Sequence, residues 1–389
     1  MNGPALGRAV ALGLAVTVVG PLPAFLLGAV SVQMRRDLDF DIAALGVSIS
    51  IFFAVAAIAS PPLGRLGDRL GGRRTMRLGA LGAAATLAAI AFGARSLTSL
   101  LACMVLGGLA NGLLQPAVNL YLARRVQNAR QGLVFGAKQA AIPAAILLSG
   151  LSVPAIALTV GWRWCFALGA ALALAAALAV PRDALPVEQR VDPGDDEGLA
   201  TRTLLYLGAA GALAAMSGNA LGAFYTAASV DAGVGEGAAG LLLALGSATS
   251  LAARVGAGWL ADRRGWEGFR QVSMMLVAGA GGFALLAAGA PGALVVGTLL
   301  AFGAGWGWPG LFNFAVVARN RRAVAAATGI TQGGVYVGAA LGPLSFGLIA
   351  GELSFTTAWI VVAALALISG AIVAIARPGP AVAARAATG

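Results

Sequence analysis

The chain alternates between long apolar stretches and short polar connections. Each apolar stretch holds about 20 residues, which is the length that a helix needs to cross the hydrocarbon of a bilayer. The first stretch is longer than the core of a signal peptide and lacks a convincing small-residue cleavage site, so we count it as a span. The pattern predicts twelve membrane-spanning helices, at residues 9–33, 42–63, 76–94, 97–123, 133–158, 163–181, 203–229, 237–261, 269–290, 292–318, 323–350 and 359–376.

Composition places the chain in the same class. Hydrophobic residues make up 59% of it, charged residues make up 11%, and its mean hydropathy is +0.87. A soluble domain is far more polar, so a chain of this composition is stable only where lipid surrounds most of it. We therefore expect an all-α polytopic membrane protein.

The distribution of positive charge predicts the orientation of the chain. The net charge is +11, and nearly all the arginines fall in the short connections between spans. If both termini are cytoplasmic, twenty arginines lie in cytoplasmic segments and only four, Arg35, Arg36, Arg95 and Arg163, lie on the other side. Because positively charged loops stay in the cytoplasm, we expect a multi-pass protein of a bacterial cytoplasmic (inner) membrane, and we expect no nucleic-acid partner.

The residue types that the chain lacks exclude several kinds of chemistry. It has no histidine and only two cysteines, Cys103 and Cys165, both within predicted spans. We therefore expect no metal cluster, no disulfide framework and no cofactor. The sequence places no nucleophile beside a base, so an enzyme is not expected either. All fifteen carboxylates lie in the connections between spans or in the central linker.

The two halves of the chain repeat each other. An acidic segment around Asp195 separates the sixth span from the seventh and has the composition of a solvated linker. We expect an N-terminal unit at residues 1–181, a cytoplasmic linker at 182–202 and a C-terminal unit at 203–389. The pattern G-x-x-x-D-R-x-G follows the second span and recurs about 194 residues later, after the eighth.

With this motif and this duplication, the chain resembles the major facilitator superfamily over essentially its whole length. The resemblance implies two six-helix bundles related by a pseudo-twofold axis, which rock about a central site. We expect a monomer. The resemblance also implies that the motif is a latch between the bundles, although its arginines could instead only enforce topology. The residues assigned to this latch are Gly64, Asp68, Arg69, Arg73, Arg74, Asp262 and Arg263.

Two cations inside predicted spans are the most informative ionisable residues. Lys138 is the only lysine of the chain, and it lies about 9 Å from the cytoplasmic start of the fifth span. Arg254 lies about 10 Å from the cytoplasmic end of the eighth. The resemblance makes these two helices neighbours across the bundle interface. Two cations repel in a low dielectric, so we expect a small anionic substrate to join them.

Two further roles for these cations stay open. Each long side chain could reach along its helix to the cytoplasmic surface, or could serve a structural hydrogen bond. The segment from Arg254 to Asp262 also resembles helix 8 of the oxalate and monocarboxylate transporters. In that branch the arginine binds the carboxylate of the substrate.

Polar and aromatic residues at helical spacing are expected to complete the site. Asn111, Gln115 and Asn119 share one helix face, because they recur every four residues. Gln332 and Tyr336 share a face for the same reason. Each amide could equally join two helices. Further candidates are Gln139, Asn219, Tyr225, Trp306, Trp308 and Asn313.

The expected function is secondary transport of a small organic or inorganic anion by alternating access. Coupling stays open among proton symport, exchange for a counter-anion and facilitated diffusion. The alternative is an exporter of hydrophobic or zwitterionic compounds, which would be drug or metabolite efflux. The chain departs from the proton-coupled drug exporters of the superfamily in two places. Met104 stands about where they carry an arginine, and the fifth span has only Pro143 and Pro154 in place of a G-x-x-x-G-P pattern.

Overall fold

The computed structural model describes residues 3–123, 131–181, 199–264, 268–320 and 324–376. Within these ranges every regular element is helical and no strand occurs, which confirms the predicted all-α fold. Two short segments, Val153–Ala157 and Ala301–Gly305, are π-helical. The α-helices are α1 (Gly3–Val19), α2 (Leu22–Ala29), α3 (Ser31–Leu38), α4 (Ile42–Leu70), α5 (Gly72–Gly93), α6 (Leu97–Ala123), α7 (Gln131–Ser152), α8 (Trp162–Ala179), α9 (Thr201–Asp231), α10 (Glu236–Arg264), α11 (Phe269–Ala288), α12 (Pro291–Leu300), α13 (Pro309–Ala318), α14 (Val324–Glu352) and α15 (Phe355–Ala376).

The described helices supply the predicted number of membrane crossings. Eleven of the spans are long and apolar enough to cross a membrane, and α1 with α2 forms a twelfth if this bent pair is one span. The pair bends by 54°. Prolines explain the bend, because Pro21 and Pro23 donate no backbone hydrogen bond and their rings clash with a continuous helix. The chain is therefore a multi-pass membrane protein.

The predicted span at 292–318 is also interrupted. It consists of α12, the π-helical segment Ala301–Gly305 and α13. Pro309 begins α13, where a missing backbone donor is tolerated, but the same proline cannot continue the preceding turn. The result is a short non-helical stretch at residues 306–308 in the middle of the span.

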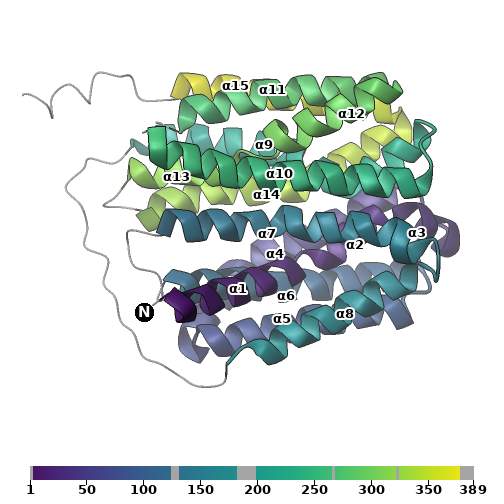
Figure 1. The fold of residues 1–389 in the computed structure, drawn as a ribbon, viewed down its shortest axis with the longest axis horizontal. Coiled ribbons are helices and arrows are strands. Elements are labelled where there is room, and N and C mark those ends of the chain that lie inside the picture. Colours follow the sequence, from purple (N-terminus) through teal and green to yellow (C-terminus); the bar gives the residue numbers. More distant parts are fainter. Residues whose placement is uncertain (1–2, 124–130, 182–198, 265–267, 321–323, 377–389) are drawn as a thin grey trace, which may run out of the picture.

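The helices form two groups that lie side by side (Figure 1). The N-terminal group is α1 to α8, and the C-terminal group is α9 to α15. Across the boundary α4 packs against α14, α7 against α10, and α2 against α9. The linker predicted at 182–202 lies largely outside the described residues, since the structure describes only 199–202 of it.

The two ends of the molecule differ in charge. We call one the arginine-rich end: it carries the turn from α4 to α5 and the turn from α10 to α11, with exposed Arg65, Arg74, Arg264 and Arg270. The helix α1 begins at this end, on the left of Figure 1. The other end, which carries α3, is called the opposite end.

Close helix contacts join the two groups toward the opposite end. A Cβ atom on Gly46 of α4 would stand 2.5 Å from the carbonyl oxygen of Pro343 in α14. A Cβ atom on Gly150 of α7 would stand 2.7 Å from the carbonyl oxygen of Gly240 in α10. Only glycine fits where two backbones approach so closely. Small residues at these positions therefore determine how tightly the groups meet.

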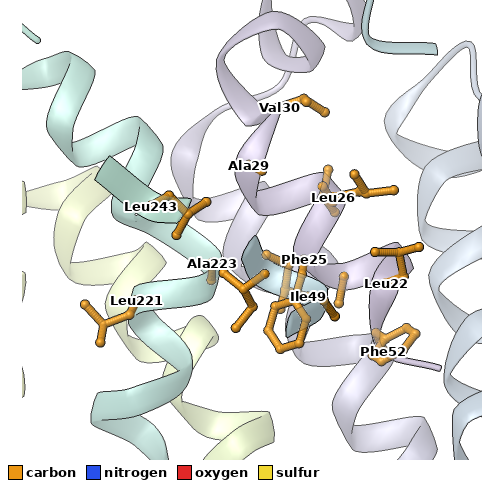
Figure 2. Packing of buried hydrophobic residues seen from close by; sticks show 14 of the residues in the cluster. Leu22, Phe25, Leu26, Ala29, Val30, Ile49, Phe52, Leu221, Ala223 and Leu243 are labelled. Atoms are coloured by element: carbon orange, nitrogen blue, oxygen red, sulfur yellow. The ribbon is translucent and has the colours of Figure 1, made fainter. Parts of the chain in front are cut away.

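One apolar cluster continues through this boundary. Figure 2 shows Phe25 of α2 and Ile49 of α4 on one side, with Leu221 of α9 and Leu243 of α10 on the other. All four side chains are at most 2% exposed. The cluster therefore closes the space between the two groups at this level.

Substitution of Gly46 by leucine tests the close contact between α4 and α14. We expect a loss of roughly 1–3 kcal/mol, seen as a lower melting temperature of the purified protein, because the neighbouring atoms belong to rigid backbone. The matched control is Gly281→Leu in α11, where an added Cβ meets nothing within 4 Å. Equal melting temperatures for the two variants would show that the contact does not hold the groups together.

Candidate functional site

The guanidinium of Arg254 in α10 bonds the backbone of two other spans. Arg254 is 3% exposed, in the half of α10 that leads to the arginine-rich end. Its Nε and Nη2 atoms donate to the carbonyl oxygen of Trp306 at 3.2 and 2.8 Å. Its Nη1 atom donates to the carbonyl oxygen of Gln139 in α7 at 2.6 Å. Arg254 thus links the C-terminal group to the N-terminal group through neutral acceptors.

The broken span explains why the Trp306 carbonyl can accept these bonds. Trp306 lies between the π-helical segment and α13, outside regular helix. A backbone carbonyl at such a position needs a partner from elsewhere when it is buried. The hydroxyl of Ser250, one turn before Arg254 on α10, also points to this oxygen at 3.5 Å. The break in one span therefore provides the acceptor for a cation in another.

The backbone at Lys138 lies close to the Arg254 guanidinium in space. The Nζ atom of Lys138 donates to the Oδ1 atom of Asn119 in α6 at 2.7 Å. Arg254 bonds the carbonyl of Gln139, the residue that follows Lys138, and consecutive Cα atoms are about 3.8 Å apart. The structure therefore brings the backbone at the lysine next to the guanidinium. We call Lys138 and Arg254 the cation pair.

The cation pair has no ionic partner among the described residues. The ion pairs found among the described residues are Arg36 with Glu236 and Arg163 with Asp37, and both lie at the opposite end. The acceptors of the cation pair are two backbone carbonyls and one amide oxygen. These groups satisfy hydrogen bonds but leave the positive charge unbalanced.

The predicted polar face of α6 runs toward Lys138. The Nε2 atom of Gln115 donates to the Oδ1 atom of Asn111 at 3.3 Å. Asn111 is buried beside the bend between α1 and α2, where a Cβ atom on Gly20 would stand 2.7 Å from its Oδ1 atom. Asn119, farther along the same face, accepts from Lys138. The face therefore connects the bend of the first span to the cation pair.

Two candidates lie on α14, and one of them, Tyr336, shares the helix face that meets the N-terminal group. Tyr336 precedes Pro343 by seven residues, so the two share one helix face, and Pro343 meets Gly46 of α4. Tyr336 is 40% exposed and lies about 10 Å nearer the arginine-rich end. Gln332, one turn earlier, donates through Nε2 to the Oδ1 atom of Asn313 in α13. This amide pair joins two helices of the C-terminal group.

Other candidates have different partners. The Tyr225 hydroxyl is buried against that of Thr298, and Tyr225 lines a cavity of about 10 Å³ within the C-terminal group, together with Ser229 and Trp359. The Asn219 amide donates to the carbonyl of Ala215 in its own helix, at 2.9 Å. These bonds do not connect to the cation pair.

Of the two tryptophan candidates, Trp308 is buried with an unpartnered Nε1 atom. The ring of Trp306 belongs to a larger aromatic cluster.

The sequence analysis did not predict the other members of this aromatic cluster. Phe25 of α2 lies 6.1 Å from Trp306 and 6.1 Å from Phe53 of α4, measured between ring centroids. Trp306 lies 6.2 Å from Phe302. A phenylalanine in an apolar span carries no distinguishing signal, so only the packing identifies these rings. They separate the level of the cation pair from the opposite end.

The latch predicted at the arginine-rich end is described only in part. The side chains of Asp68 and Asp262 lie outside the described residues, so the latch stays a prediction. Arg69 and Arg74 are exposed and Arg73 is half-buried. Gly64 lies where a Cβ would meet the ring of Pro116 at 3.6 Å, and Arg263 lies 4.3 Å from the ring of Trp259.

A different polar contact joins the groups at the opposite end. Glu236, the first residue of α10, accepts from Arg36 Nη1 at 2.6 Å and from Gln33 Nε2 at 2.6 Å. Both donors belong to α3 of the N-terminal group. Burial lowers the pKa of the neighbouring Arg35 guanidinium, while the carboxylates of Asp41 and Asp231 act to raise it. We call the Arg36, Gln33 and Glu236 contact the opposite-end lock.

Eleven crossings among the described residues, or twelve with the bent pair, form two groups with buried polar residues between them, an arrangement typical of membrane transporters. The sequence profile of the Major Facilitator Superfamily matches residues 12–207 and again 207–389. The chain belongs to the Major Facilitator Superfamily, whose members are transporters and not enzymes.

Solved structures agree with this fold. A bacterial homologue of the human lysosomal transporter Spinster, in an inward-facing and occupied conformation, has a TM-score of 0.77 at 14% identity, covering 98% of this chain and all (100%) of that one. The human organic anion transporter MFSD10 (TETRAN) has a TM-score of 0.68 at 19% identity, covering 96% of this chain and 100% of that one. No curated protein sequence matches the chain significantly.

Replacement of Arg254 by alanine tests its structural contribution. We expect a loss of about 1–3 kcal/mol, because the carbonyls of Trp306 and Gln139 lose their donors inside the protein. The stability of Arg254→Lys should lie between those of the natural chain and of Arg254→Ala, because an ammonium lacks the planar fork that reaches both oxygens. The measurement is thermal unfolding of purified protein, with Arg264→Ala, an exposed arginine of the same helix, as control. If Arg254→Ala and this control have the same melting temperature, the bonds to the two carbonyls do not stabilise the packing of the helices.

Proposed function

We propose that this transporter moves a small carboxylate-like anion across the cytoplasmic membrane, with Lys138 and Arg254 holding the anionic group. The observation that carries the proposal is the cation pair, one member from each group of helices, with only neutral acceptors among the described residues. Uncompensated charge at membrane depth is costly, and an arriving anion would offset that cost.

The cation pair retains donors for such an anion. A guanidinium has five N–H groups, of which three serve the carbonyls of Trp306 and Gln139. An ammonium has three, of which one is directed at Asn119. The remaining donors come from two helices, so a carboxylate could be held from two sides. Arginine favours this kind of planar oxyanion.

The arrangement supports alternating access. We assign the arginine-rich end and both termini to the cytoplasm, on the positive-inside rule. Contacts at Gly46, Gly150 and the opposite-end lock then close the outer side, as in an inward-facing carrier. Residues 1–181 and 203–389 would move as two bodies joined by the linker 182–202. The latch at the arginine-rich end would close in the other state.

The bond from Arg254 to Gln139 supports a role for the substrate in this movement. It is a link between the two groups at the level of the cation pair. An anion bound to the guanidinium competes with the Gln139 carbonyl for the same donors. Substrate binding would therefore change the strength of a contact that must differ between the two states. Exchange for a second anion or symport with a proton would both use this competition.

One structural neighbour agrees with the proposed substrate class. MFSD10 is described as an organic anion transporter, which agrees with the proposal, although at 19% identity the likeness concerns the fold.

The aromatic cluster at Phe25, Phe53 and Trp306 favours a second candidate function. Rings of this kind suit an exporter of hydrophobic or zwitterionic compounds.

An anion panel tests the substrate class. Purified protein should melt at a higher temperature with its anion, because a ligand at 100 times its Kd adds about 2.7 kcal/mol. We expect Lys138→Ala and Arg254→Ala to abolish the shift and Arg264→Ala to keep it. Vesicle uptake should show labelled monocarboxylates entering and cationic dyes excluded. The proposal would be contradicted, and the exporter favoured, if an anion raised the melting temperature equally in both variants, or if the vesicles took up dyes alone.

Substitution of Glu236 by glutamine tests the opposite-end lock. The change removes the ion pair with Arg36, so the outer side should open more often. The measurement is alkylation of a cysteine at Ala223, which is 2% exposed at the boundary beside Gly28 of α2, in a protein whose Cys103 and Cys165 have been replaced. We expect faster alkylation in Glu236→Gln and no change in Glu352→Gln, an exposed carboxylate near that end. Unchanged alkylation in both would mean that the lock does not hold the closed state.

A further inference from the structure

A groove on the C-terminal group lies where α9 begins and α15 ends. Its volume is about 550 Å³, and its lining includes Arg202, Thr203 and Tyr206 from α9, with Ile372 and Ile375 from α15. Both helix ends lie at the arginine-rich end of the molecule (Figure 1). None of these residues belongs to the cation pair, the latch or the opposite-end lock.

One wall of the groove is suited to hydrocarbon. Ile375 is 84% exposed, and Tyr206 is 47% exposed. Both α9 and α15 are long and apolar enough to cross a membrane. Exposed apolar side chains on such helices face lipid acyl chains and not water. An occupant of the groove therefore presents hydrocarbon to Ile372 and Ile375.

The mouth of the groove carries a cation, Arg202, whose side chain is positioned by Tyr206. The Nε and Nη2 atoms of Arg202 donate to the Tyr206 hydroxyl at 3.1 and 3.0 Å, and the guanidinium carbon lies 5.5 Å from the centre of that ring. Two of five N–H groups are used, which leaves three for an anion. Among the described residues no carboxylate forms an ion pair with Arg202. Arginine and tyrosine at a span end are typical of the level of the lipid headgroups.

We propose that this groove binds one anionic phospholipid. The phosphate lies on Arg202, next to the hydroxyl of Thr203, and an acyl chain follows Ile372 and Ile375. A soluble anion would leave the apolar wall without a partner, and a lipid without net charge would leave the positive charge of Arg202 unbalanced. Because the groove combines an apolar wall with a cation, it fits a ligand that has both an acyl chain and a net negative charge.

Native mass spectrometry of the full-length protein tests the site. The protein is released from nanodiscs that contain phosphatidylglycerol and phosphatidylcholine in equal amounts, and the lipid retained is identified. We expect one retained phosphatidylglycerol for the natural chain, and about fivefold less retention for Arg202→Ala. Tyr206→Phe, which keeps the ring but removes the hydroxyl that positions Arg202, should lose less. Arg270→Ala, an exposed arginine outside the groove, is the matched control and should retain the lipid.

Three results would overturn the proposal. Equal retention by Arg202→Ala and Arg270→Ala would place the lipid elsewhere. Retention of phosphatidylcholine as strongly as phosphatidylglycerol would remove the role of charge. Displacement of the lipid by inorganic phosphate would identify a site for free phosphate instead. Arg202 is exposed, so its variant should keep the melting temperature of the natural chain, and loss of lipid can then be read without loss of fold.

Discussion

The guanidinium of Arg254 is the constraint on which the centre of this molecule depends. It is buried among apolar spans and is held by the carbonyls of Trp306 and Gln139, which belong to different groups of helices. A charge in this position needs several hydrogen bonds at once, and backbone carbonyls provide them only where a helix is interrupted or where its outer face is accessible. The irregular backbone near Trp306 is therefore part of the polar site as well as an interruption of a span.

The same relation between broken helices and polar groups occurs in the N-terminal group. The prolines at 21 and 23 bend the first span, and Asn111 of α6 lies against Gly20 at the bend. Asn119, two turns along that face, accepts from Lys138. The two halves thus place their irregular segments and their polar side chains at the boundary between the groups. This placement follows from the rule that non-helical backbone within a membrane is tolerated where protein surrounds it.

Much of the fold could be predicted from the sequence, because hydropathy alone locates spans of about 20 residues. The bend at Pro21 and the interruption before Pro309 follow from proline chemistry, but spans predicted from hydropathy continue through both. The link from Arg254 to Gln139 could not be predicted, because a backbone acceptor leaves no trace in residue type. The same is true of Phe25, since its role arises from the ring of Trp306 in the other half. The contact of Tyr225 with Thr298 was not predictable either, because it depends on how two helices of the C-terminal group pack.

The glycine contacts between the two groups have a kinetic consequence. At Gly46 and Gly150 the nearest facing atoms belong to the backbone, and the one side chain near them, that of Phe224, would lie 3.4 Å from a Cβ atom on Gly46. Two such surfaces can part without any rotamer having to change, and they can rejoin in the same register. Dispersion forces at each contact are individually small, so separation is a series of minor losses and not one large barrier. A boundary whose closest contacts are made by backbone atoms suits two groups of helices that separate and rejoin repeatedly.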